Sequence, residues 1–283
     1  MPAKEKKEPV IGTSYEITWC PGCANFMILA SVKNAIGKLI KEGFCKQEDF
    51  AITTDIGCNS KIFDYINLSG FYGLHGRSLP TGVGIKFGNP NLHVLSFVGD
   101  GGLYNEGIEH LIHTCRYNSD MTLIVHDNQS FSLTAGQPTA TTQQGYKSKV
   151  EPYGEVNRPL NPLKLVLASG ATFVARCDAR DINHTSEIIE KAIKHKGFAF
   201  VEIIQDCLIF NTEMNFRNKL AYKIPDNKDK KKAESYSDEW NYNSKQGKIP
   251  IGVIYQELIP TLEENWKPLK ELIEKKSYWK YIK

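Results

Sequence analysis

The chain has 283 residues, of which 41% are hydrophobic, so it can bury a sizeable core. Its 35 Lys and Arg residues nearly balance its 32 Asp and Glu residues, and a net charge of +3 excludes the strongly basic surface typical of nucleic-acid binding. No apolar run is long enough to span a membrane, so we expect neither a nucleic acid nor a membrane as a partner.

The first residues are charged and have no apolar stretch of the kind that directs secretion. We therefore expect an N-terminal tail over residues 1–14 and a cytoplasmic protein. Because thiols stay reduced in the cytoplasm, the seven cysteines are not expected to form a disulfide framework.

The first motif with chemical meaning is the C-x-x-C pair of Cys20 and Cys23. Two thiolates at this spacing can bind one centre. Three interpretations are open at this point. A thioredoxin-like redox pair would favour an apolar strand before Cys20. A structural zinc site would favour a second such pair or two histidines. An iron–sulfur cluster needs four thiolates, of which two can come singly from elsewhere in the chain.

Two further cysteines favour the iron–sulfur interpretation, because each follows a predicted strand. Cys58 comes shortly after the apolar stretch 50–52, and Cys207 comes after the stretch 198–204. Since ligands bind at the edge where parallel strands end, both thiols are expected at that edge. The other three cysteines lie in a predicted loop, helix and strand, where a free cysteine behaves as a small hydrophobe: Cys45, Cys115 and Cys177.

Residues 93–128 predict one strand–helix–strand unit around a glycine-rich turn. The stretch 93–98 is typical of a buried parallel strand, apolar residues recur at helical spacing over 108–115, and 121–125 is a second apolar strand. The two strands are followed at the same edge by Asp100 and Asn128, which can therefore share one ion.

The residue types at that edge favour Mg²⁺ and a phosphate. Asp100 and Asn128 offer the hard oxygen ligands that Mg²⁺ prefers. Gly99, Gly101 and Gly102 allow main-chain N–H groups to approach a phosphate closely. The plainer alternative is a turn in which Asp100 only caps a helix, but an Asn at the matching strand end favours the metal site.

The following residues extend the α/β pattern. The stretch 132–149 is rich in Thr, Gln and Gly without periodicity, which predicts a loop over the phosphate site. A helix is expected over 163–168, a strand over 171–175 and a helix over 186–195. We therefore expect a doubly wound α/β domain with a mostly parallel sheet over residues 15–222.

The segment 223–283 is expected to be a linker and a C-terminal arm. Residues 223–247 contain few aliphatic side chains and cannot form a core of their own. From Ile251 on, helical content returns with an apolar stripe that either joins the core or contacts a partner: Leu262, Trp266, Leu269 and Leu272.

Eight segments, taken together and in order, resemble the β subunit of 2-oxoacid:ferredoxin oxidoreductases, and as a set they are far more specific than any single motif. The segments are WCPGC at 19–23, DIGC at 55–58, HGRSLP at 75–80, GDG at 99–101, DN at 127–128, LTAGQ at 133–137, FVAR at 173–176 and QDC at 205–207. This resemblance implies the thiamin diphosphate (ThDP) diphosphate-binding type of domain.

The resemblance also implies the cofactors and their ligands. One 4Fe-4S cluster would be held by Cys20, Cys23, Cys58 and Cys207. Mg²⁺, bridging to the diphosphate, would be held by Asp100, Asn128 and the main-chain carbonyl of Ser130. The other cofactor contacts would be Ile56, Gly57, Cys58, Asn59, His75, Gly99, Gly101, Gly102, Ser132, Leu133 and Thr134.

Two residues receive a catalytic role from the same resemblance. The family position of His75 faces the cofactor, and that of Lys61 lies near the substrate carboxylate. The plainer alternatives are a structural histidine and a solvated lysine. The chain departs from the family pattern at Gly102, where many members have Asp, and at Ala135, where many have Lys.

The activity implied is oxidative decarboxylation of a 2-oxoacid, of pyruvate or 2-oxoglutarate type, with CoA. It would give acyl-CoA and CO₂ and pass electrons through the cluster to ferredoxin. An α subunit would supply the Glu that activates ThDP. Without one, Glu16 and Glu106 lie nearest the cofactor motifs. Two alternatives stay open: a colourless ThDP decarboxylase or synthase subunit without redox function, and an iron–sulfur carrier that binds no ThDP.

Overall fold

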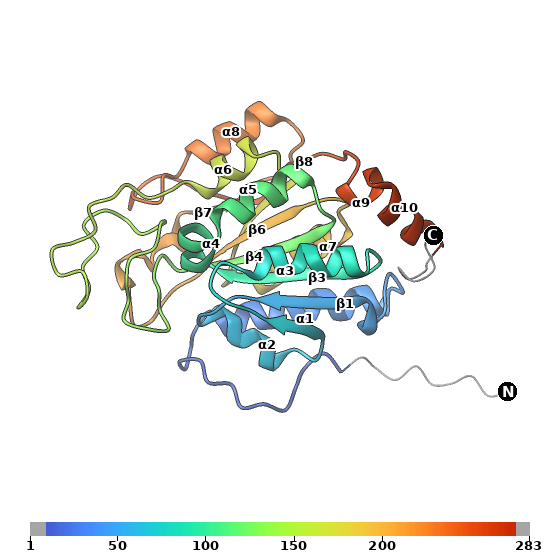
Figure 1. Cartoon of the computed structure of the whole chain (residues 1–283). Coiled ribbons are helices and arrows are strands. Elements are labelled where there is room, and N and C mark those ends of the chain that lie inside the picture. Colours follow the sequence, from blue (N-terminus) through green and yellow to red (C-terminus); the bar gives the residue numbers. More distant parts are fainter. Residues whose placement is uncertain (1–9, 276–283) are drawn as a thin grey trace.

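An eight-stranded sheet with helices on both faces organises residues 10–275, the part of the chain that this computed structural model describes (Figure 1). The strand order is β2-β1-β3-β4-β6-β5-β8-β7, and every neighbouring pair is parallel except β5 with β8. The strands are β1 (Phe50–Thr54), β2 (Ser69–Tyr72), β3 (His93–Gly99), β4 (Met121–Asp127), β5 (Phe173–Asp178), β6 (Ala199–Ile204), β7 (Ala221–Lys223) and β8 (Ile249–Gln256). The predicted doubly wound, mostly parallel sheet is confirmed.

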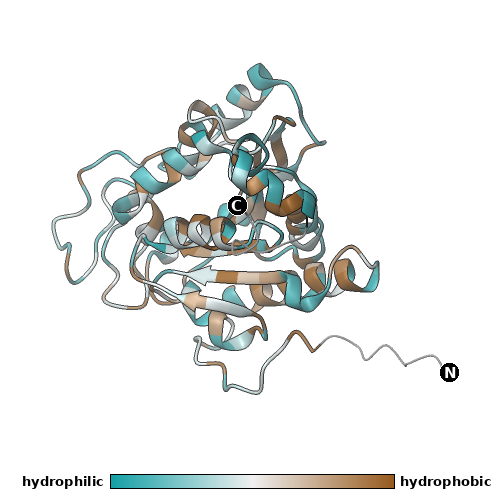
Figure 2. Cartoon of the chain, turned by 45° about the vertical axis from the view of Figure 1, so that its right-hand side comes forward, coloured by the Kyte–Doolittle hydropathy of each residue, from teal (hydrophilic) through white to brown (hydrophobic). Residues whose placement is uncertain are grey.

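Two hydrophobic clusters fill the space between the sheet and its helices. One face is covered by α1 (Asn25–Lys41) and α7 (Ile182–Lys194), and the other by α3 (Ser78–Gly88), α5 (Ile108–Tyr117), α6 (Pro162–Ala168) and α8 (Lys230–Asp238). The shorter helices are α2 (Ile62–Tyr65), α4 (Asp100–Glu106), α9 (Leu262–Asn265) and α10 (Lys267–Lys275). Figure 2 shows the hydrophobic residues gathered on the strands and hydrophilic residues on the outer helices, as burial of apolar surface requires.

Local signals explain where the helices begin and end. α6 begins after Asn161, whose side chain accepts a hydrogen bond from the main-chain N–H of Lys164. α7 begins after Asp181, which caps the N–H of His184 in the same way. α5 ends at Asn118, which adopts the left-handed conformation with φ of 52°.

The register of the central strands brings three segments to one edge of the sheet. Gly99 at the end of β3 pairs with His126 of β4, and Asp127 of β4 pairs with Ile204 of β6. The residues that follow β3, β4 and β6 therefore emerge side by side. As the sequence predicted, this edge is where Asp100 and Asn128 lie.

The structure corrects the expectation of a linker and arm over residues 223–283, of which 276–283 lie outside the described residues. Strand β8 pairs with β5 in the main sheet, and α8 packs against the sheet next to α6. Trp240 and Tyr242 are buried over the Arg176 guanidinium, at 5.4 and 5.3 Å from its central carbon to the ring centroids. Residues 223–247 contain few aliphatic side chains, but their aromatic rings supply much of the buried surface. Residues 251–256, expected to be helical, are part of β8.

The apolar stripe near the C-terminus packs within this chain. Leu269 and Leu272 are fully buried, and the ring of Trp266 lies 5.5 Å from that of Phe87. Of the expected N-terminal tail, residues 1–9 lie outside the described residues, while Gly12 forms a β-bridge with Ile66. Over residues 10–275 no helix is long and apolar enough to cross a bilayer.

Candidate active site

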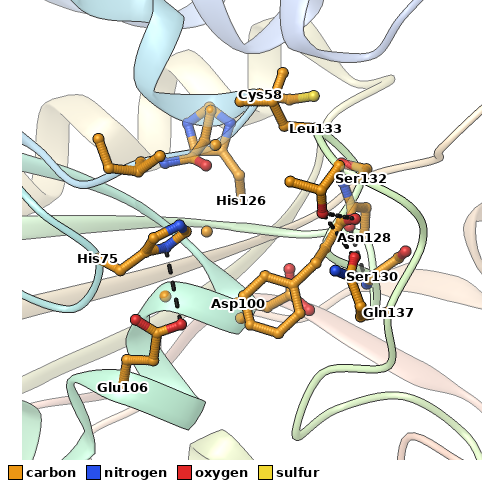
Figure 3. Close-up of a pocket in the computed structure, with 18 of the residues that line it drawn as sticks. Cys58, His75, Asp100, Glu106, His126, Asn128, Ser130, Ser132, Leu133 and Gln137 are labelled. Atoms are coloured by element: carbon orange, nitrogen blue, oxygen red, sulfur yellow. Dashed lines mark hydrogen bonds and ion pairs between the residues drawn. The ribbon is translucent and has the colours of Figure 1, made fainter. Parts of the chain in front are cut away.

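The turn from β3 into α4 borders a cavity of about 280 Å³ at the ligand edge of the sheet (Figure 3). All the residues that the sequence assigned to the organic cofactor line it: Ile56, Gly57, Cys58, Asn59, His75, Gly99, Gly101, Gly102, Ser132, Leu133 and Thr134. The three residues assigned to Mg²⁺ line it as well: Asp100, Asn128 and Ser130. The fold thus brings segments from four parts of the chain around one space.

The glycines of the turn leave no room for side chains. A Cβ atom on Gly99 would lie 2.9 Å from the Asn59 side-chain oxygen, and one on Gly101 would collide with the Phe131 ring. On Gly102 it would collide with the Asp55 carboxylate. The main chain is therefore bare where α4 begins, as close approach of a diphosphate requires.

Asp100 is buried and held in place by two hydroxyl groups. Thr139 Oγ1 donates to its carboxylate at 2.6 Å and Thr141 Oγ1 at 3.1 Å. Burial raises the pKa of Asp100 to about 6, and it also raises the pKa of neighbouring Asp127. The Arg217 guanidinium lies 3.9 Å from Asp127 and partly offsets this effect. A divalent cation at Asp100 would stabilise the charged carboxylate, so the site fits Mg²⁺.

Asn128 and Ser130 lie on either side of Gln129, whose φ of 56° is left-handed. The Asn128 amide nitrogen donates a hydrogen bond to Ser132 Oγ at 3.0 Å. The Asn128 amide oxygen accepts one from the main-chain N–H of Ser130 at 3.1 Å. Ser130 Oγ is buried with no hydrogen-bond partner in the described structure. An amide oxygen, a main-chain carbonyl and one carboxylate form the kind of oxygen set to which Mg²⁺ adds water and phosphate.

A second cavity, of about 160 Å³, is lined by all four cysteines that the sequence assigned to the cluster: Cys20, Cys23, Cys58 and Cys207. Burial, together with smaller contributions from the other three thiols, raises the pKa of Cys23 to about 11. Mutual repulsion of this kind disappears when thiolates bind iron. Cys45, Cys115 and Cys177 are buried and do not line this cavity.

The two proposed metal groups need different arrangements of ligands. Among residues 10–275, no three His, Cys, Asp or Glu side chains are close enough to hold one metal ion. The Mg²⁺ set contains only one such residue, Asp100. The thiolates of a 4Fe-4S cluster each bind a different iron, so four cysteines around one cavity fit that group without converging on a point.

The two cavities share a wall. Five residues line both of them: Cys58, Asn128, Ser132, Leu133 and Gln205. Cys58, assigned to the cluster, and Asn128, assigned to Mg²⁺, therefore lie on the same partition. The cavity lined by the four cysteines therefore directly adjoins the larger cavity at the ligand edge of the sheet.

The two proposed catalytic residues lie in different places. His75 is half-buried and faces the first cavity, where its Nδ1 is 4.0 Å from the Glu106 carboxylate (Figure 3). Lys61 lines the cysteine cavity instead, and its ammonium group donates to the Thr18 carbonyl at 3.3 Å. Glu16 is exposed and lines neither cavity.

Sequence reasoning missed three polar residues of the first cavity, His126, Gln137 and Gln205, and also Asn25 of the cysteine cavity. His126 is buried, and burial lowers its pKa to about 3, so the imidazole is neutral. It ends the apolar run of β4 just before Asp127, and a polar residue at that place in a buried strand was the signal available.

Comparisons with known proteins agree with this geometry. Residues 55–203 match the family model described as "Thiamine pyrophosphate enzyme, C-terminal TPP binding domain". The fold and the site therefore define a ThDP-binding domain. The chain is 39% identical to the 2-oxoacid:ferredoxin oxidoreductase subunit beta of Saccharolobus solfataricus, covering 87% of this chain and 84% of that protein. It belongs to the β subunits of the 2-oxoacid:ferredoxin oxidoreductases.

Two further matches extend the range of the similarity. The 2-oxoglutarate synthase subunit KorB of Methanocaldococcus jannaschii is 33% identical over 91% of this chain and 93% of its own. A solved 2-oxoglutarate:ferredoxin oxidoreductase from Magnetococcus marinus, with 2-oxoglutarate, coenzyme A and succinyl-CoA bound, superposes with a TM-score of 0.87 at 31% identity. That match covers 99% of this chain and 94% of the other.

Proposed function

We propose that this chain is the β subunit of an enzyme that converts a 2-oxoacid and CoA to acyl-CoA and CO₂ and passes the electrons to ferredoxin. The shared wall carries the proposal. Cys58 and Asn128 line both cavities, so a carbon–carbon bond can be broken on one side while electrons leave on the other. Neither alternative, a non-redox ThDP subunit or an iron–sulfur carrier, explains why the two cavities adjoin.

ThDP would lie in the first cavity with its diphosphate against the bare main chain at Gly99, Gly101 and Gly102. Asp100, Asn128 and the Ser130 carbonyl would hold the Mg²⁺ that joins diphosphate to protein. Thr139 and Thr141 orient the Asp100 carboxylate for this purpose through their hydroxyl groups. When bound, ThDP would supply the carbanion chemistry and the cluster would accept the electrons singly.

Cys20, Cys23, Cys58 and Cys207 act as ligands in this proposal, not as nucleophiles. Burial raises the pKa of Cys23 and of Cys207, so neither thiol is activated for attack. We assign His75 to the cofactor face of the first cavity, where Glu106 lies beside it. Lys61 remains a candidate for binding the substrate carboxylate, from the side of the cysteine cavity.

The substrate would be a 2-oxoacid of pyruvate or 2-oxoglutarate type. The names of the similar proteins include both the general 2-oxoacid activity and 2-oxoglutarate, which supports this class of substrate. We further propose a cytoplasmic heterodimer with an α subunit that brings the activating Glu, and ferredoxin as the electron acceptor.

One set of measurements tests the function. The chain is co-expressed with its α subunit and purified anaerobically. Iron, sulfide, magnesium and thiamin are then quantified, and visible spectra are recorded with and without dithionite. We expect a brown protein that bleaches on reduction and reduces viologen dye only with both a 2-oxoacid and CoA. A colourless protein that contains thiamin would establish the non-redox alternative, and a cluster without thiamin would establish the carrier.

A further inference from the structure

Two buried side chains join the cysteine cavity to the cofactor cavity. His126 Nδ1 lies 2.9 Å from the side-chain oxygen of Asn25, and both residues are inaccessible to solvent. Asn25 lines the cysteine cavity and His126 lines the cofactor cavity. Asn25 also follows Cys23 closely, and its main-chain N–H lies near enough to that thiol to act to lower its pKa. His126 therefore holds the residue whose main-chain N–H lies beside one of the proposed cluster thiolates.

On its other side, His126 meets the segment that carries another proposed ligand. The Gln205 side chain interacts with the imidazole, which acts to raise the pKa of His126, and it lines both cavities. Gln205 comes two residues before Cys207. The main chain of Gln205 is fixed, because its N–H donates to the Asp127 carbonyl at 2.9 Å. One imidazole thus contacts side chains next to Cys23 and next to Cys207.

The hydrogen-bonding groups of the three side chains can satisfy one another. In the described structure Asn25 Nδ2, His126 Nε2 and Gln205 Oε1 are buried without a partner. Asn25 amide oxygen and nitrogen are interchangeable by a half-turn of the amide. After that half-turn, Asn25 Nδ2 donates to His126 Nδ1. His126 Nε2 is then the protonated ring nitrogen, and its N–H can be donated to Gln205 Oε1. A neutral imidazole then completes an Asn25–His126–Gln205 bridge.

We infer that His126 is a positioning residue that, through this bridge, sets the reduction potential of the cluster bound by Cys23 and Cys207. The inference rests on the proposed function. Hydrogen bonds to cluster sulfurs favour the reduced, more negative state. By fixing Asn25, His126 keeps an N–H group on the Cys23 sulfur, and it does so from the partition that separates the cluster from the cofactor cavity.

The test is a redox titration of the cluster in the α–β holoenzyme, followed by electron paramagnetic resonance. His126→Leu keeps a side chain of similar bulk and removes both hydrogen bonds, and Asn25→Ala removes the partner. Each variant should lower the equilibrium constant for one-electron reduction of the cluster by about tenfold. This corresponds to a midpoint potential about 59 mV more negative. The double variant should shift no further than either single one, because both act on one bridge. His126→Asn, whose carboxamide can reach Asn25, should recover most of the shift.

The matched control is His184→Leu. His184 is also buried with an unpartnered Nδ1, but it lies in α7 and lines neither cavity. It should leave the titration unchanged. Single variants within threefold of the wild type, or additive shifts in the double variant, would overturn the inference. Loss of the cluster from both single variants would also overturn it, by showing a role in folding. Absence of a cluster from the wild-type enzyme would instead refute the proposed function.

Discussion

The indole N–H of Trp19 donates a hydrogen bond of 2.6 Å to the main-chain carbonyl of Cys58. Trp19 precedes Cys20 directly, and its buried ring packs edge-on against Tyr65 at 4.8 Å between centroids. One side chain therefore ties the C-x-x-C segment to the loop after β1. Three of the four cavity cysteines lie on these two neighbouring segments: Cys20, Cys23 and Cys58. Cys207 lies on a separate segment, which follows the end of β6.

Because Cys207 lies on a segment of its own, its replacement is the most direct test of the proposed cluster. Cys207→Ser should reduce the iron and sulfide content far below the four of each expected per chain, because one of four ligands is lost. Cys115→Ser is the matched control, since Cys115 is buried in α5 away from the cavity. Iron analysis and visible absorbance measure both. Equal losses from the two variants would contradict the ligand assignment.

Replacement of Asp100 tests the metal site. Asp100→Ala removes the only carboxylate proposed to hold Mg²⁺ and should weaken ThDP binding by roughly a hundredfold or more. Iron content should stay near that of the wild type, because the cysteines are untouched. Calorimetry with ThDP and Mg²⁺, alongside iron analysis, provides the measurement. Affinity that stays within a few-fold would show that Asp100 is not a metal ligand.

Gly102, where many family members have Asp, is predicted to tolerate no side chain here. A Cβ atom would meet the Asp55 carboxylate, which Asn59 holds at 2.7 Å and Ser60 at 2.9 Å. Gly102→Ala should therefore cost about 1–3 kcal/mol of stability and weaken ThDP binding. Gly84→Ala, in open space on α3, should stabilise the protein by about 0.5–1 kcal/mol. Urea unfolding of both variants decides the matter, and a neutral Gly102→Ala would refute the steric argument.

His195 should make stability depend on pH. Burial lowers its pKa to about 4 from an ordinary value of 6.5, so the unfolded chain binds more protons between these values. Stability contributed by the neutral imidazole is complete above pH 6.5 and is lost as the pH falls toward 4, by about 3 kcal/mol at most. His195→Gln can keep a bond to Thr172 but cannot titrate. Its urea midpoint should fall less between pH 7.5 and pH 5, and equal falls would exclude His195 as the cause.

The isolated chain should hold its cluster but not turn over. Among residues 10–275, Glu106 is the only Glu that lines the first cavity, and it lies beside His75. We expect the activating Glu from the α subunit, so the purified β chain should reduce no viologen dye with any 2-oxoacid and CoA. Adding the α subunit should restore activity. Turnover by the 283-residue chain alone would contradict this prediction, and Glu106→Gln would then be the next variant to measure.

The sequence by itself determined the features that are local along the chain. Residues 93–98 and 121–125 are apolar runs that end in Asp100 and Asn128, and parallel strands end at the same edge whatever surrounds them. The C-x-x-C pair is equally local. These patterns were sufficient to predict the parallel centre of the sheet and, with the family resemblance, many of the residues that line the two cavities.

Tertiary structure alone decided which distant segments meet. His126 and Asn25 are 101 positions apart, and nothing in the apolar run of β4 indicates that its last imidazole reaches the start of α1. The segment after residue 223 reads as a linker, yet Trp240 and Tyr242 are buried against Arg176 of β5. A local pattern reports how a segment folds, whereas the partner of a buried polar or aromatic side chain is set by the packing of the whole sheet.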